Sequence, residues 1–456
     1  MSFIALDLGT TFIKGALLDL DSLQMSNIRR LPFPGPLPGL PTYFHEVDPL
    51  LVVATVRQLI EELLALTAQC DGIVFCTQMH GLVLCSERGE PLSNMITWQD
   101  QRVLTPHPAG GGTHFERLQQ LIPNEEQQQL GNELQPSRPL CYLYWMAENG
   151  KLPRQPAFPA ALTDFVIANL CQCEPTTEPT NAGAHCLFNL TTGQWHSVLI
   201  ERLGLAHLRW HEVRPFGAVA GQLQIGGRSL PCYSPVGDHQ CALVGAFLSE
   251  GELSLNISTG SQATLLTSQL DLGNYQTRPF FDGSFINTIT GVPAGRALNA
   301  LVNLLVEIPT KQGIELADPW HTIVEAVATV EQSDLVVNLA FYDSLLGKEG
   351  HVLHMREENI SVGHLFHAAF QNMADNYHNS ALRISPQKAW QNIVFSGGLA
   401  QKLESLRTII QRKFDTPYRL CVSSEDTLLG LMALALVASG RQTTVAAAIE
   451  ELKEQS

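Results

Sequence analysis

The chain has 456 residues, of which 45% are hydrophobic and 16% are charged, and its formal net charge is −16. That length exceeds what one hydrophobic core usually serves, so we expect a globular protein with two domains. The acidic balance argues against general nucleic-acid binding, which needs clustered Lys and Arg, but it does not exclude an anionic nucleotide held by a few local groups.

Two apolar runs near the start, Phe3–Leu8 and Phe12–Asp19, are separated by a Gly-Thr-Thr turn. This pattern predicts two strands joined by a tight turn. The first strand ends in a carboxylate suited to a metal ion or its water shell. The turn offers hydroxyls, N–H groups and a close backbone approach, and the second strand offers a positive charge. The residues concerned are Asp7, Gly9, Thr10, Thr11 and Lys14. The alternative interpretation is an ordinary hairpin with a polar turn.

Residues 20–43 hold five prolines and predict a surface loop. A helix is predicted over 50–68 and a short buried strand over 73–76. Gln78 and His80 follow at the carboxyl end of that strand, where open α/β sheets place ligand contacts. Both side chains could hydrogen-bond a polyol, although His80 could equally be a structural histidine.

A second polar cluster, Thr97–Arg102, contains one large aromatic residue. Trp98 could stack on the apolar face of a sugar, and Asp100 could accept hydrogen bonds from its hydroxyls. The alternative is a buried Trp98 beside a surface pair of Asp100 and Arg102.

The middle of the chain carries fewer polar motifs. Gly110–Gly112 predicts a flexible link, residues 118–130 a helix, and Trp145 a core position. Asn181 lies in a predicted polar turn over 177–181, where it is either a ligand of a substrate or a residue that shapes the turn.

Proline and serine residues over 230–236 predict a boundary that divides the chain into domains 1–233 and 234–456. Asp238 then opens a run of small and apolar residues typical of a packed helix. A carboxylate at a helix N-terminus between two domains is well placed to act as a general base. The alternative is helix capping, for which Asp is one of the preferred residues.

The opening pattern returns at residues 252–266, again as a strand, a turn and a second strand. The turn consists of Thr259, Gly260 and Ser261. Two such hairpins, one near the start of each half, predict an internally duplicated architecture with two phosphate-holding turns that face one cleft.

Gly397 and Gly398 follow a predicted strand over 393–396. Glycines there would let a flat ligand such as an adenine ring lie against the backbone, and the alternatives are helix capping and tight packing. A last strand over 419–422 and a buried helix over 428–435 complete the prediction.

Ten cysteines are scattered along the chain, and their one close pair, Cys171 and Cys173, has no second pair at matching spacing. A zinc site is therefore not expected. The sequence shows no signal peptide and no apolar run that could span a bilayer. We expect reduced thiols, a cytoplasmic location and no membrane partner.

Taken together and in this order, the motifs resemble those of the FGGY carbohydrate kinases over almost the whole chain. Within that family they look most like sedoheptulokinases, and the Gln-Met-His-Gly motif is shared with xylulokinases. The matching segments are Asp7–Thr11 with Lys14, Gln78–Gly81, Trp98–Arg102, Gly237–Gln240, Ser258–Ser261 and Ser396–Gly398.

The resemblance implies an α/β fold of two RNase-H-like domains of the actin/hexokinase type, with a catalytic cleft between them. It implies ATP-dependent phosphorylation of a sugar hydroxyl, with Asp238 as general base and Asp7 as the group that holds Mg²⁺. The implied sugar contacts are Gln78, Met79, His80, Trp98, Asp100, Asn181 and Gln240, mainly in the N-terminal domain. The implied ATP contacts are Gly9, Thr10, Thr11, Lys14, Thr259, Gly260, Ser261, Gly397 and Gly398, mainly in the C-terminal domain. A sugar and ATP are the expected partners, without nucleic acid, and the chain is expected to be a monomer or a homodimer.

Three features depart from the family pattern: His239 beside the predicted base, Ser396 in the predicted adenosine loop, and a reduced second-domain segment at Gly347–Glu349. They leave three functions open. The first is a ketose kinase acting on sedoheptulose or a similar sugar. The second is a kinase for xylulose, ribulose or another polyol. The third is a catalytically weak sugar- or nucleotide-binding regulator on the same fold.

Overall fold

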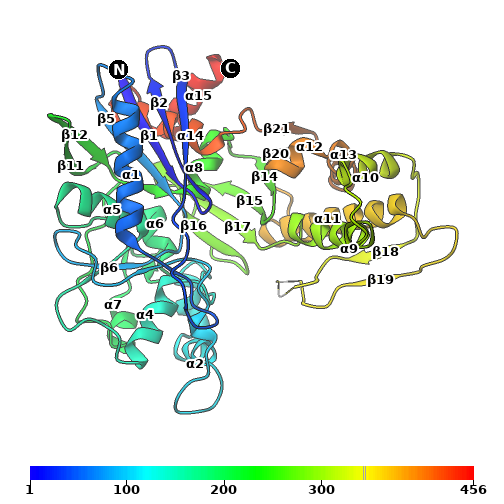
Figure 1. Cartoon of the computed structure of the whole chain (residues 1–456), viewed down its shortest axis with the longest axis horizontal. Helices are drawn as coiled ribbons and strands as arrows, with labels where there is room; N and C mark the ends of the chain where they lie inside the picture. Colours follow the sequence, from blue (N-terminus) through cyan, green and yellow to red (C-terminus); the bar gives the residue numbers. More distant parts are fainter. Residues whose placement is uncertain (343, 345, 456) are drawn as a thin grey trace.

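Two mixed β-sheets, one from each half of the chain, form the framework of the computed structural model, which describes residues 1–342, 344 and 346–455 (Figure 1). The first sheet contains β1 (Ser2–Leu8), β2 (Phe12–Asp19), β3 (Gln24–Pro32), β5 (Gly72–Thr77), β11 (Val219–Ile225), β12 (Arg228–Tyr233) and β13 (Val236–Gly237). Their order is β11-β12-β5-β1-β2-β3, and β13 also pairs with β5. Strands β1, β5 and β13 run parallel, so their carboxyl ends meet at one edge of the sheet.

The second sheet repeats this plan. It contains β14 (Glu252–Ile257), β15 (Ser261–Thr267), β16 (Gln276–Pro279), β17 (Phe285–Thr290), β20 (Asn392–Ser396) and β21 (Tyr418–Leu420). Its order is β16-β17-β15-β14-β20-β21, so the path β5-β1-β2-β3 of the first sheet reappears as β20-β14-β15-β17. Each half begins with an antiparallel hairpin whose first strand also pairs in parallel with a later strand. The predicted duplicated α/β architecture is confirmed.

Helices cover both faces of the first sheet because successive β1 side chains point to opposite faces. Ile4 packs in a cluster with α1 (Pro49–Leu64) and α5 (Leu162–Cys171), whereas Phe3 packs with helices from the second half of the chain. Those helices are α8 (Asp238–Gly245), α14 (Asp426–Ala438) and α15 (Val445–Gln455). The chain therefore ends on the sheet on which it began, and both termini lie at the same end of the molecule (Figure 1).

The other face of α8 packs on the second sheet through Leu243, Ala246 and Leu248. Helix α8 therefore lies between the two sheets. The remaining second-lobe elements are α9 (Gly295–Lys311), α10 (Pro319–Ala328), α11 (Val362–Ile384), α12 (Gly398–Lys402), α13 (Glu404–Phe414), β18 (Val336–Asn338), β19 (His351–Leu353) and a 3₁₀ turn (Phe281–Gly283).

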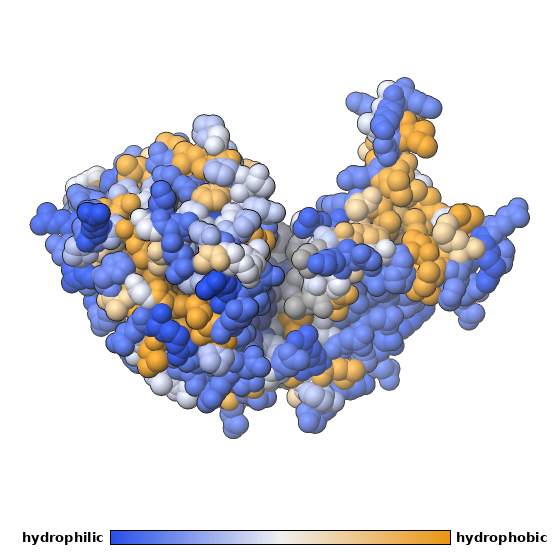
Figure 2. All heavy atoms as spheres, turned by 90° about the horizontal axis from the view of Figure 1, so that it is seen from below, coloured by the Kyte–Doolittle hydropathy of each residue, from blue (hydrophilic) through white to orange (hydrophobic). Residues whose placement is uncertain are grey.

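The first half carries a large additional layer below its sheet (Figure 1). It comprises α2 (His114–Leu121), α3 (Asn124–Gln129), α4 (Pro139–Glu148), α6 (Pro179–Ala184), α7 (Ser197–Arg202), β4 (Glu46–Val47), β6 (Val83–Cys85), β7 (Met95–Ile96), β8 (Phe158–Ala160), β9 (Phe188–Asn189), β10 (Gln194–Trp195) and a 3₁₀ turn (Arg102–Leu104). Viewed from below, the molecule has two lobes with a deep hollow between them (Figure 2).

Three local expectations were wrong. Residues 24–32 form strand β3 rather than a loop, because they pair with β2 as an exposed edge strand, which tolerates Pro32 and shows no buried alternation. The predicted helix over 118–130 breaks into α2 and α3 at Pro123. Asn181 lies in helix α6 rather than in a turn.

The described residues contain no helix long and apolar enough to cross a membrane. The ten cysteines are all free, as expected for reduced thiols, and most are buried. No group of three or more His, Cys, Asp or Glu side chains within the described ranges is arranged to hold a metal ion.

Candidate active site

Two carboxylates stand at the carboxyl edge of the first sheet, beside the hollow between the lobes. Asp7 lies on β1 opposite Cys76 of β5, and Asp238 follows β13, which pairs with the other side of β5. Two strand spacings place the two backbones about 10 Å apart. The side chains are close enough for the Asp7 carboxylate to raise the pKa of Asp238.

Asp7 is buried with few partners for its charge. Its Oδ2 accepts a hydrogen bond from the Thr427 hydroxyl at 2.7 Å, and Lys14 Nζ lies 3.8 Å from the same oxygen. Burial raises the pKa of Asp7, while Thr427 and Lys14 oppose that rise. Lys14 is itself bound to Glu425 at 3.2 Å, and Arg30 also pairs with Glu425. Lys14 thus lies at the predicted phosphate turn, but a carboxylate already neutralises it.

Asp238 is the first residue of α8, and the capping position belongs to Gly237, which has no side chain to cap with. The alternative that Asp238 is the N-cap is therefore wrong. Its Oδ1 accepts a bond from the His239 backbone N–H at 2.8 Å. Burial, followed by the nearby Asp7 carboxylate, raises the pKa of Asp238 to about 7, while Arg278 opposes the rise. A carboxylate with that pKa can exchange a proton near neutral pH.

Helix α6 clamps the strand that leads to Asp238. The backbone N–H of Gly237 donates to the Thr180 hydroxyl at 2.8 Å, and Thr180 in turn donates to the buried Glu178 carboxylate. Asn181 donates its amide to the Pro235 carbonyl at 2.8 Å and is almost fully buried. Asn181 therefore supports the strand and cannot reach a sugar in the cleft, which corrects its predicted role.

The first hairpin turn contacts two predicted sugar residues. Trp98 donates its indole N–H to the Thr10 hydroxyl at 3.0 Å, and Gln78 donates to the Gly9 carbonyl at 3.3 Å. Thr10 and Thr11 are exposed. Trp98 is 41% exposed, so the alternative of a buried tryptophan is wrong and its ring remains available for stacking.

Asp100 does not have the predicted role. It is 0% exposed, and its two oxygens accept bonds from Arg102 Nε at 2.9 Å and Arg102 Nη2 at 2.7 Å, as well as from the backbone N–H groups of His45 and Arg102. With its acceptor sites filled and no solvent contact, Asp100 holds the loop that carries Trp98 rather than a substrate hydroxyl. The ion pair with Arg102 was foreseen, but as a surface pair.

His80 Nε2 has no hydrogen-bond partner among the described residues. Its Nδ1 lies 3.1 Å from the Ala184 carbonyl oxygen, and because a carbonyl only accepts, Nδ1 carries the proton and Nε2 is an acceptor. Burial and Arg138 lower the pKa of His80, which keeps the ring neutral. Met79 is buried against the Gly237 backbone, and Gln240 is buried with its amide N–H₂ bound to the Pro279 carbonyl. Met79 and Gln240 therefore pack beneath the site and support the backbone around Asp238.

In the second hairpin, Thr259 and Gly260 are exposed at the turn. Ser261 is buried, and its hydroxyl bonds to the Asn256 carbonyl at 2.5 Å and to Tyr377. The Ser261 hydroxyl is therefore not available to ATP, because it is already used inside the second lobe, and only the backbone of Ser261 remains for the predicted ATP contact.

The two predicted adenine glycines differ. Gly397 has φ +87°, and a Cβ there would lie 2.5 Å from the Ile257 carbonyl oxygen, so tight backbone packing requires this glycine. A Cβ at Gly398 would meet nothing within 4 Å. Gly398 therefore borders open space at the start of α12, as a ligand-facing glycine would. The neighbouring Ser396 hydroxyl accepts a bond from Asn256 at 3.0 Å.

One further carboxylate at this site was not singled out from the sequence. Asp426 starts α14 near Asp7, and its pKa is raised to about 6, chiefly by burial. Asp7, Asp238 and Asp426 thus place excess negative charge in one region, which a cation would relieve. Mg²⁺ keeps several waters and takes one or two carboxylates plus phosphate oxygens, so these residues suit it although they form no closed metal cage. The adjacent acidic residues Glu425 and Asp426 at the start of α14 were the visible signal in the sequence.

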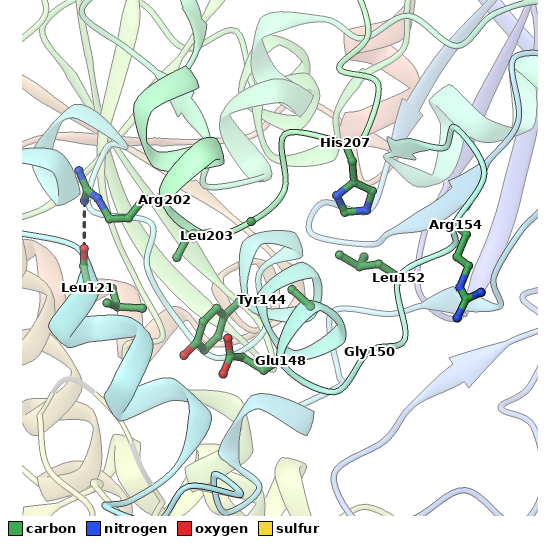
Figure 3. Close-up of a pocket in the computed structure, with 11 residues that line it drawn as sticks. Leu121, Tyr144, Glu148, Gly150, Leu152, Arg154, Arg202, Leu203 and His207 are labelled. Carbon is green, nitrogen blue, oxygen red and sulfur yellow. Dashed lines mark hydrogen bonds between the residues drawn. The ribbon is translucent and has the colours of Figure 1, made fainter.

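A separate hollow of about 590 Å³ lies in the lower layer of the first lobe (Figure 3). Tyr144, Arg154 and His207 are among its lining residues, and Arg202 lines it while bound to Glu126. It contains none of the predicted site residues.

Comparisons with known proteins identify the family of the chain. A family model described as "FGGY family of carbohydrate kinases, N-terminal domain" matches residues 2–245. Glycerol kinase 2 of Saccharolobus solfataricus is 24% identical over 323 residues, which is 65% of this chain and 58% of that protein. Sedoheptulokinase of Mus musculus is 21% identical over 407 residues, covering 82% and 80%. The crystal structure of gluconate kinase from Lactobacillus acidophilus superposes with a TM-score of 0.85 at 17% identity, covering 98% and 91%.

Proposed function

Because the chain belongs to the FGGY family of carbohydrate kinases, we propose that it transfers the γ-phosphoryl group of ATP to a hydroxyl of a sugar. The observation that carries this proposal is the placement of Asp7 and Asp238 at one sheet edge, with the pKa of Asp238 raised to about 7. A protein that only binds ligands needs neither carboxylate there.

In the proposed reaction, Asp238 accepts the proton of the attacking sugar hydroxyl. That oxygen forms a bond to the γ-phosphorus as the bond to the β–γ bridging oxygen breaks, and ADP leaves. Phosphoryl transfer depends mainly on positioning and on neutralising charge. Asp7 would hold Mg²⁺ through water, and Mg²⁺ would neutralise the phosphates. The exposed turns at Thr10 and Thr259 would bind phosphate oxygens with backbone N–H and hydroxyl groups.

The acceptor is proposed to be a ketose, with sedoheptulose as the first choice and a pentulose as the second. His80 offers a neutral acceptor nitrogen to a sugar hydroxyl, and Trp98 offers an exposed ring for stacking. The relatives are named for glycerol, sedoheptulose and gluconate, so the choice of acceptor must be measured.

The test is ADP release with Mg²⁺-ATP against a panel of ketoses, polyols and aldonates. We expect one acceptor class to stimulate ADP release well above the rate with ATP alone. If ATP binds but no acceptor stimulates turnover, the kinase proposal fails in favour of a binding protein on the same fold.

A pair of adjacent glycines tests the nucleotide site. Gly398→Ala should leave the melting temperature unchanged, because a methyl group there meets open space. It should raise the KM for ATP by several-fold, because the methyl group would occupy the space proposed for adenine. Gly397→Ala is the matched control. It forces a positive φ on alanine and a clash with Ile257, so we expect a loss of about 1–2 kcal/mol or more in unfolding free energy. An unchanged KM in Gly398→Ala would place adenine elsewhere.

The rate should also depend on pH through Asp238. The base must be ionised, and its folded pKa is about 7, so activity is lost as pH falls through that value. We expect kcat/KM to decline about tenfold per pH unit below pH 7 and to level above it. A profile that is flat between pH 5.5 and 8 would contradict Asp238 as the titrating base.

A further inference from the structure

A buried ion cluster joins the two lobes and contains none of the groups that react in the mechanism proposed above. Glu133, between α3 and α4 in the first lobe, is 1% exposed and binds two arginines. Arg278 of β16 in the second lobe places its Nε 2.5 Å from one Glu133 oxygen, and Arg138 places its Nη2 2.9 Å from the other. Burial would raise the pKa of Glu133, but the two arginines outweigh it and hold the pKa at about 2. The carboxylate is therefore ionised at any working pH.

The residues just before Glu133 bind the start of β16 and the residues that precede it. Asn132 donates its amide to the carbonyls of Gly273 and Tyr275, each at 2.8 Å, and the Thr277 N–H donates to the Gly131 carbonyl at 3.0 Å. Gly131 has a positive φ, and a Cβ there would lie 2.1 Å from the Thr277 carbonyl oxygen. The segment that leads into Arg278, residues 273–277, is thus fastened to the first lobe beside the ion pair.

Arg278 extends this connection to the base. Its Nη1 lies 3.0 Å from His239 Nδ1, and because a guanidinium only donates, Nδ1 must be the acceptor. The proton of the neutral ring is then on Nε2, which points to the Thr264 hydroxyl at 3.4 Å. Thr264 lies 2.7 Å from the Thr288 hydroxyl, which donates to a backbone carbonyl. Each member of the chain therefore has a defined donor direction.

The chain of contacts ends at the catalytic carboxylate. The backbone N–H of His239 donates to Asp238 Oδ1, while its ring is held by Arg278. We propose that Arg278 is a positioning residue: through His239 it fixes the orientation of Asp238, and through Glu133 it ties that orientation to the first lobe. This inference rests on the proposed role of Asp238, and it gives His239, a departure from the family pattern, a structural reason.

A purely stabilising role does not explain why charged residues occupy these buried positions. Three buried ionic groups lose hydration that their pairing only partly restores, and well-packed apolar residues often serve stability equally well. The guanidinium of Arg278 donates to the carboxylate from Nε and to the imidazole from Nη1, whereas the donors of a lysine all lie on one nitrogen and cannot reach two acceptors placed in this way. The geometry therefore requires Arg278 specifically.

The experiment compares Arg278→Lys and Arg278→Gln in the full chain, using the best acceptor from the panel. Lysine keeps a charge for Glu133 but loses the bond to His239, so we expect near-normal thermal stability with kcat lowered by roughly 10- to 100-fold. The KM for ATP should stay within about twofold. Arg278→Gln should lower both stability and kcat.

Arg419→Gln is the matched control. Arg419 binds Glu252 and the carbonyls of Ala246 and Phe247 at the other end of the same helix, α8. We expect that variant to lose stability while kcat stays within about twofold of wild type. Equal losses of kcat in Arg419→Gln and Arg278→Lys would reduce the role of Arg278 to general support of α8.

A readout that needs no acceptor separates this inference from the proposed activity. Hydrogen–deuterium exchange should accelerate over 131–133 and at the first turn of α8 in Arg278→Lys, because the connection between them is cut. If the wild-type chain phosphorylates no acceptor but this exchange pattern appears, the connection from Glu133 through Arg278 to α8 is supported and the kinase proposal is contradicted. Wild-type exchange at the first turn of α8 together with wild-type kcat would overturn the inference.

Discussion

Asp238→Asn is expected to lower kcat by about 10²- to 10⁴-fold, the usual contribution of a general base. The amide has the shape of the carboxylate and can still accept the His239 N–H bond, but it cannot take the proton of a sugar hydroxyl. Removing a buried charge close to Asp7 also relieves repulsion, so the melting temperature should hold or rise. Steady-state ADP release and thermal unfolding of the same preparation measure both effects.

Asp48→Asn provides the matched control for that substitution. Asp48 caps α1 by accepting the Leu50 N–H at 2.9 Å, and asparagine caps equally well. Activity and stability should both remain at wild-type values in the control. Wild-type turnover in Asp238→Asn would remove Asp238 from the reaction, whereas a large fall in melting temperature would show that its charge serves the fold.

The duplicated fold was predictable because its two hairpins each produce a recognisable pattern within a short stretch of sequence. Buried strands next to Gly/Thr turns occur twice at the same relative place, and each pair of strands forms its hairpin through neighbouring residues. Strand β3 was not predicted because an exposed edge strand has no buried face. Only its pairing with β2 defines it as a strand. Sequence patterns report burial well and pairing between polar segments poorly.

The position of a candidate site residue was predictable where that residue lies near the end of its own strand, as Asp7 does. The role of such a residue was not predictable where it depends on distant partners. The Asp100 carboxylate is fully hydrogen-bonded to Arg102 and the His45 backbone. The Asn181 amide is bound to the Pro235 carbonyl, 54 positions away. Arg278 meets Glu133 across 145 positions, and no spacing rule connects the two. A polar residue in a motif can equally hold the loop that carries the ligand contact.

Asp7→Asn is the second substitution expected to have a large effect. It removes the charge proposed to hold Mg²⁺, while the amide oxygen can still accept the Thr427 hydroxyl. We expect kcat to fall by at least about 10²-fold, as when a preorganised electrostatic group is removed from an active site. The residual activity should need more Mg²⁺ for saturation.

The same substitution should also change the pH profile in a direction set by the repulsion between the two carboxylates. Asp7 raises the pKa of Asp238, so its loss lowers that pKa, and the acid limb of the residual activity should move to lower pH. Asp19→Asn, on the exposed end of the same hairpin, should leave both the Mg²⁺ requirement and the limb in place. If Asp7→Asn retains the wild-type Mg²⁺ dependence but shifts the limb, Asp7 acts on the base alone and the cation is held elsewhere. If neither changes, the two carboxylates do not share a site, and the proposal built on them fails.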